Sequence, residues 1–77
     1  MLGFIEGELL HQDETKVLVK TSQGLGYEIF YNSRIEGTSC SLFLSQIFKE
    51  KSVDLYGFKS VSEKQNFELL ISVNGVG

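Results

Sequence analysis

The chain has 77 residues, 42% hydrophobic and 22% charged, which allows one small domain near the lower size limit for independent stability and excludes a disordered chain. Its net charge of −3 argues against strong nonspecific binding to nucleic acid, because Lys and Arg normally supply most of the affinity for phosphates. Residues 1–58 hold five Lys or Arg against eight Asp or Glu, whereas residues 59–77 hold two of each, so the acidity lies in the first part.

The first expected element is a half-buried strand over residues 2–10, in which side chains alternate between two faces. Glu6 and Glu8 interrupt this apolar stretch and exclude a signal peptide, and no run in the chain approaches membrane-spanning length. A soluble, cytoplasmic protein is therefore expected. A polar turn follows at Gln12-Asp13-Glu14. In the strand, one face is expected to hold Ile5, Gly7 and Leu9 and the other Phe4, Glu6 and Glu8.

Two further short strands are expected over residues 16–20 and 26–31, separated by a turn at Ser22-Gln-Gly24. Val17 and Val19 are expected to point inward, and Tyr27, Ile29 and Tyr31 are expected to share one face.

After a loop over residues 32–38, a longer strand is expected over 39–49 and a fifth over 53–58, joined by a charged tip at Glu50-Lys51-Ser52. Five short strands with glycines at the bends predict a mainly β fold, a small barrel.

The sequence period then changes from that of a strand to that of a helix. Ser60-Val-Ser-Glu63 has the spacing of a capping box, in which a hydroxyl and a carboxylate satisfy free N–H groups at a helix start. A helix is predicted over residues 61–73, packed against the barrel or a neighbouring subunit, and the only plausible domain boundary is near Lys59. Its apolar face is expected to hold Phe67, Leu70 and Ile71.

The end of the chain has the pattern apolar-x-x-apolar-x-Gly-apolar-Gly, which is similar to the first half of a helix-hairpin-helix motif. Such a hairpin can direct backbone N–H groups at a phosphate, and a following helix would add its own N-terminus. An ordinary helix C-cap at Asn74-Gly75, followed by a tail, is the alternative. The pattern is filled by Leu70, Val73, Gly75, Val76 and Gly77.

Four segments together resemble the RuvA family in order and spacing, and the match covers essentially the whole chain. They are Met1–Gly7, Gly24–Glu28, Leu55–Phe58 and Asn74–Gly77. The resemblance implies a five-stranded OB-fold barrel at residues 1–58, with residues 59–77 beginning a truncated helix-hairpin-helix domain. In the family a mobile third domain then contacts the motor ATPase RuvB.

What the resemblance implies for function is a non-catalytic subunit that recognises four-way DNA junctions in recombination and repair. The implied partners are junction DNA, the RuvB motor, the RuvC resolvase and other copies of the chain, as a homotetramer or a doubled tetramer. No cofactor or metal is implied. The alternative is a generic OB-fold protein-interaction or assembly module without junction specificity.

The resemblance also implies DNA contacts for Asn74, Gly75, Val76 and Gly77. Glycine would allow close backbone approach to a phosphate, and such contacts do not read base sequence.

In the family, the turn between the last two strands lies at the tetramer centre and carries acidic residues that repel phosphates. Glu50 matches the first acid, but Lys51 stands where the second is expected, so the pairs of four copies sum to about zero charge. The alternative is an ordinary solvated hairpin turn with mixed charges.

Other candidate residues favour structural roles. His11 has no second histidine or cysteine nearby to complete a metal site, and nothing brings a base to Cys40, the only cysteine, which excludes an intramolecular disulfide. No Gly-x-x-x-x-Gly-Lys loop is present, so this segment does not hydrolyse ATP by a P-loop mechanism. Four aromatic residues have two possible roles: they could form a platform on which the bases of a single strand stack, or they could pack in the core or between subunits. They are Tyr27, Phe30, Tyr31 and Phe43.

Overall fold

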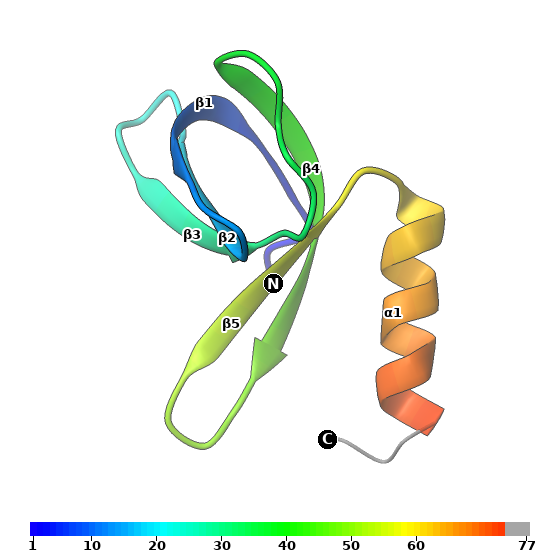
Figure 1. The fold of residues 1–77 in the computed structure, drawn as a ribbon. Coiled ribbons are helices and arrows are strands. Elements are labelled where there is room, and N and C mark those ends of the chain that lie inside the picture. The colour runs from blue at the N-terminus through cyan, green and yellow to red at the C-terminus, as the bar shows by residue number, and fades with distance from the viewer. Residues whose placement is uncertain (74–77) are drawn as a thin grey trace.

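Five strands and one helix make up the computed structural model, which describes residues 1–73 (Figure 1). The strands close into a barrel in the order β1-β2-β3-β5-β4, with β1 paired to both β2 and β4. All pairings are antiparallel except that of β3 with β5. The elements are β1 (Phe4–Gln12), β2 (Lys16–Lys20), β3 (Gly26–Phe30), β4 (Ser39–Phe48), β5 (Val53–Phe58) and α1 (Val61–Val73).

The alternation of side chains along the strands builds the core inside the barrel. Residues that point inward are apolar and shielded from water on all sides, which is the main stabilising term for a domain of this size. The inward positions of Val17 and Val19 and the shared face of Tyr27, Ile29 and Tyr31 are confirmed, because all five are buried or pack against one cluster, as do Ile5 and Leu9. The buried core consists of Ile5, Val17, Val19, Ile29, Tyr31, Leu42, Leu44 and Leu55.

The predicted bounds of the first strand, residues 2–10, are wrong: β1 begins at Phe4 and continues to Gln12. An irregularity between Leu9 and His11 shifts the register of β1 against β2 and lets the strand bend around the barrel. Simple alternation does not predict pairing beyond such a bulge. Gln12 is held by two hydrogen bonds to the backbone of Ile35, one donated by its amide nitrogen and one accepted by its amide oxygen.

Two other strands end one residue earlier than predicted, because the backbone leaves the ladder to form turns. Tyr31 follows β3, and its N–H donates to the carbonyl of Thr15. Lys49 follows β4, and its N–H donates to the carbonyl of Ser52, which closes the hairpin between β4 and β5. β2, β5 and α1 have the predicted bounds.

The hydroxyl half of the predicted capping box is confirmed, since the N–H of Glu63 donates to the Ser60 hydroxyl at 3.1 Å. Phe67 and Ile71 are half-buried against the barrel, as predicted. The prediction for Leu70 is wrong, because its side chain is 62% exposed. With about 100° of rotation per residue, Leu70 and Ile71 point in different directions, and the barrel does not cover Leu70.

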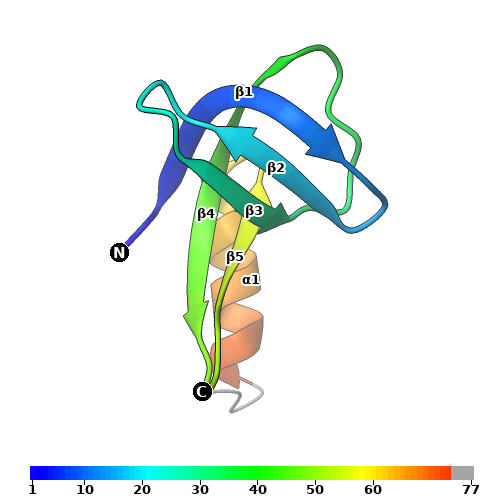
Figure 2. The same ribbon diagram turned by 90° about the vertical axis from the view of Figure 1, so that its left-hand side faces the viewer.

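The hairpin of β4 and β5 extends beyond the body of the barrel, and α1 runs alongside it (Figures 1 and 2). The tip of this hairpin and the C-terminal end of α1 therefore lie at the same end of the molecule (Figures 1 and 2).

Candidate functional site

The first part of the candidate site is the tip of the β4–β5 hairpin. Glu50, Lys51 and Ser52 are exposed. Below them, Phe48 and Val53 form the last cross-strand pair, and these apolar side chains are 59% and 51% exposed. The tip therefore presents two opposite charges above an apolar pair.

The base of the tip carries a second pair of opposite charges. The Lys49 ammonium lies 2.7 Å from a carboxylate oxygen of Asp54. The hydrogen bond and charge of Asp54 raise the pKa of Lys49, so this side chain is fully charged at neutral pH. Lys49, Glu50, Lys51 and Asp54 contribute two positive and two negative charges, which sum to zero.

The second part of the candidate site is the segment predicted to contact DNA. Asn74, Gly75, Val76 and Gly77 lie outside the described residues, as does the alternative C-cap at Asn74-Gly75. The helix that leads into this segment ends at the same end of the molecule as the hairpin tip (Figures 1 and 2). The β4–β5 hairpin and α1 therefore both extend toward this end of the molecule (Figures 1 and 2).

A row of aromatic rings joins the helix to the barrel. Tyr56 on β5 stacks on Phe30 of β3 with ring centroids 5.1 Å apart. On its other side Phe67 of α1 lies 4.9 Å from Tyr56 and 5.1 Å from Phe58. These contacts are edge-tilted or stacked, the arrangements that aromatic pairs prefer.

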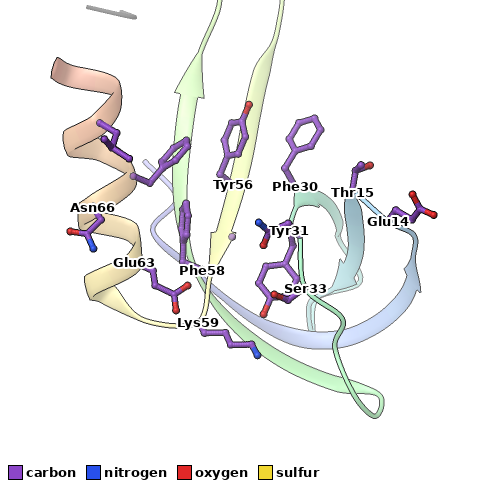
Figure 3. Close-up of a pocket in the computed structure, with 14 residues that line it drawn as sticks. Glu14, Thr15, Phe30, Tyr31, Ser33, Tyr56, Phe58, Lys59, Glu63 and Asn66 are labelled. Carbon is purple, nitrogen blue, oxygen red and sulfur yellow. The ribbon is translucent and has the colours of Figure 1, made fainter. Parts of the chain in front are cut away.

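The same rings line a groove of about 710 Å³ between α1 and the barrel (Figure 3). Tyr56 and Phe58 stand between the helix and β3, and Glu63 and Asn66 line the groove from α1 (Figure 3). Leu70 also borders it, which accounts for the exposure of this side chain. Within the described residues, the groove brings together no group of His, Cys, Asp and Glu that could hold a metal ion.

A polar contact supplements the aromatic row. Ser45 on β4 is only 2% exposed, and its hydroxyl donates to a carboxylate oxygen of Glu68 at 2.8 Å. The same oxygen accepts a hydrogen bond from the Lys64 ammonium at 2.7 Å. The bond from Lys64, and then that from Ser45, lower the pKa of Glu68, so its carboxylate is charged at neutral pH.

The aromatic residues considered as a stacking platform separate into two groups. Tyr31 is a core residue and Tyr27 packs against the core, as the packing alternative predicts. Phe30 and Phe43 lie on the outside of the barrel, where Phe30 joins the aromatic row and Phe43 contacts Phe4 at 5.3 Å. The four rings therefore do not form one exposed face on which nucleic-acid bases could stack.

The two residues considered for chemistry have surroundings that fit structural roles. Cys40 is a free, half-buried thiol that packs against the core, and burial raises its pKa, which makes it less nucleophilic at neutral pH. His11 is exposed on β1.

Sequence reasoning missed the groove and the contact between Ser45 and Glu68. One signal was present: Tyr56 and Phe58 alternate with buried Leu55 and Gly57, so β5 is apolar on both faces. A strand of this kind needs a cover on its outer face. The aromatic side chain at Phe67, seven residues after the helix cap, is the matching apolar position.

The strand order and the helix after the last strand define an OB-fold barrel, a class that binds oligonucleotides and oligosaccharides in many unrelated proteins. The particular family follows from sequence comparison. A family model described as RuvA N terminal domain matches residues 1–57, and the chain belongs to this family.

Relatives with curated names agree with this membership. A protein of Halothermothrix orenii named Holliday junction branch migration complex subunit RuvA is 37% identical over 81 residues, covering all of this chain and 41% of the relative. Proteins of the same name from Geobacter sulfurreducens and Francisella tularensis are 34% and 39% identical over 83 residues, covering all of this chain and 41% and 38% of the relatives. The chain thus spans about two-fifths of the length of these relatives. Separately, α1, the helix in the described part, is too short to cross a membrane.

Proposed function

We propose that this chain is the barrel and first helix of a Holliday junction branch-migration subunit, which binds four-way junctions in recombination and repair without catalysing a reaction itself. The observation that carries the proposal is the match of residues 1–57 to the RuvA N-terminal domain, together with relatives that cover the whole chain and are named as subunits of the branch migration complex. The division into a barrel at residues 1–58 and the start of a helix-hairpin-helix domain at 59–77 is part of the proposal.

The proposed partners follow from the same membership. Junction DNA is the ligand, a homotetramer or doubled tetramer is the assembly, and the cytoplasm is the location. ATP-driven movement belongs to the RuvB motor and strand cleavage to the RuvC resolvase. The net charge of −3 fits a subunit that recognises DNA and leaves movement and cleavage to its partners. A negatively charged chain does not bind duplex DNA tightly through overall electrostatic attraction, so it can select a junction by its shape.

Two sets of residues have proposed roles at the junction. Asn74, Gly75, Val76 and Gly77 contact the DNA backbone, which holds the protein on any sequence. Glu50 and Lys51 face the crossover from the hairpin tip. The charge of this tip sums to zero with Lys49 and Asp54 included, so we propose that it guides strands by its shape and apolar base more than by repulsion.

The test is a binding titration of a fluorescent four-way junction with the full-length gene product, with linear duplex of the same length as competitor. Tight binding that survives a large excess of duplex supports the proposal. Gly75→Asp is expected to weaken junction binding at least tenfold, because it adds a side chain and a negative charge where the backbone meets phosphate. Gly3→Asp is the matched control, since a side chain at Gly3 meets nothing within 4 Å.

Equal affinity for junction and duplex, or none, would refute junction recognition and favour the generic OB-fold interaction module. Equal effects of the two glycine substitutions would refute the role of Gly75 in particular. For the tip, Lys51→Glu restores the second acid of the family, and a changed junction affinity with unchanged duplex affinity is the expected result.

A further inference from the structure

The contact between Ser45 and Glu68 is unusual for its surroundings. On the outer face of β4, Ser45 lies between Phe43 and Ile47 and opposite Tyr56 on β5. It is nevertheless 2% exposed, because α1 covers it. A buried hydroxyl without a partner is costly, so the helix must present an acceptor at this point.

The aromatic contacts of α1 cannot by themselves select one position of the helix. Burial of apolar surface is non-directional, and Phe67 could meet Tyr56 and Phe58 over a range of helix rotations and shifts. A hydrogen bond requires a narrow range of distance and angle. The bond from Ser45 is therefore the directional part of the interface.

The sequence of α1 makes this bond strongest in one register. Sliding the helix by one turn, about 5.4 Å, would bring the residue four positions before or after Glu68 opposite Ser45. A shift in one direction would place Lys64 there, a cation that cannot accept the bond, and a shift in the other would place Ser72, whose neutral hydroxyl would accept a weaker bond than the Glu68 carboxylate does. Lys64 also holds the Glu68 carboxylate in place from the preceding turn.

We propose that Ser45 is a positioning residue, whose buried hydroxyl fixes α1 on the barrel in one register through Glu68 and so sets where the segment after α1 meets DNA relative to the hairpin tip. The role of Ser45 in fixing the register of α1 is inferred from the described residues alone, whereas the consequence for DNA binding rests on the proposed function. α1 ends at the same end of the molecule as the tip, so a turn or tilt of the helix moves everything that follows it with respect to Glu50 and Lys51 (Figure 1).

The orientation of α1 is measured by residual dipolar couplings of the backbone N–H groups in the 77-residue chain. In the unsubstituted chain, barrel and helix fit one alignment tensor. In Ser45→Ala and in Glu68→Ala, the helix couplings are expected to depart from the tensor of the barrel, while the barrel couplings are unchanged. Glu68→Gln keeps an acceptor oxygen and is expected to restore the fit.

The matched control is Ser41→Ala. Ser41 lies on the same strand and its hydroxyl also donates to a glutamate, Glu6 at 3.2 Å, but the pair is exposed and away from α1. This variant is expected to leave the helix couplings unchanged. Helix couplings in Ser45→Ala and Glu68→Ala that still fit the barrel tensor as well as those of Ser41→Ala would overturn the proposal.

The consequence for DNA is measured in the full-length gene product. Ser45→Ala is expected to lower the ratio of junction to duplex affinity roughly three- to tenfold, the worth of one hydrogen bond, with Ser41→Ala unchanged. A loss of stability alone would lower both affinities and leave their ratio the same, which would overturn the positioning role. If the unsubstituted protein shows no junction preference, the proposed function fails, whereas the dipolar couplings still decide the position of α1.

Discussion

Gly7 is the position at which a single added methyl group should harm the barrel most. A Cβ at this position would lie 2.2 Å from the carbonyl oxygen of Lys20 and 3.1 Å from a methyl group of Val19. A carbon and a carbonyl oxygen normally stay about 3.3 Å apart, so β1 and β2 would have to separate by about 1 Å. The obstacle is backbone, which cannot rotate away as a side chain tip can.

The cost of Gly7→Ala follows from this separation. Overpacking of a tight site costs about 1–3 kcal/mol, and weakening one or two ladder hydrogen bonds adds about 1 kcal/mol. We expect the free energy of unfolding to fall by about 2–4 kcal/mol and the melting temperature by roughly 10–30 °C. The assay is urea unfolding followed by circular dichroism, with Gly3→Ala as the control, because a Cβ at Gly3 meets nothing within 4 Å. A difference below about 0.5 kcal/mol between the two variants, the range of ordinary surface changes, would refute the reasoning.

Three further predictions concern the helix. Ser60→Ala removes the N-cap and is expected to cost about 1 kcal/mol in urea unfolding, and an unchanged midpoint would contradict the role of the cap. Phe67→Ala removes the ring between β5 and α1 and should cost about 2–3 kcal/mol, whereas Leu70→Ala, an exposed site, should cost under 1 kcal/mol; equal costs would contradict the packing. The pKa of Glu68 lies below its usual 4.5, so the contribution of this carboxylate to stability is present above pH 4.5 and is lost as the pH falls through the lower folded value. In Lys64→Ala, an NMR titration should show a higher pKa for Glu68, and an unchanged pKa would contradict the ion pair.

The barrel could be predicted from the sequence because its signals are local. Alternation marks each strand, and Ser60 at the right spacing from Glu63 marks the start of the helix. The bulge in β1 could not be predicted, since it depends on how the strand must bend to pair with β2 and β4 together. The wrong expectation for Leu70 has a similar origin: helical spacing defines an apolar stripe, but the barrel covers only one side of it.

The candidate site was predictable in part. The hairpin pattern placed Glu50 and Lys51 in an exposed turn, and the structure confirms this position. The functional roles of these two residues and of residues 74–77 stay predictions. The partner of Asp54 was not predictable, because Lys49 and Lys51 are both near it in sequence and only the twist of the hairpin selects Lys49. The contact of Ser45 with Glu68 joins segments 23 residues apart, and no local pattern encodes it.

The closure of the barrel has a consequence for how the chain folds. β3 and β5 are joined through a single register pair, Phe30 with Tyr56, and β1 meets β4 through residues such as Glu6 and Ser41, which are 35 positions apart. The hairpins β1–β2, β2–β3 and β4–β5 can each form early from neighbouring segments, but none of them encloses the core alone. We therefore expect the rate-limiting step to be the meeting of the two preformed sheets, with a rate set by the entropy of closing the chain between β3 and β4 and little affected by hairpin stability.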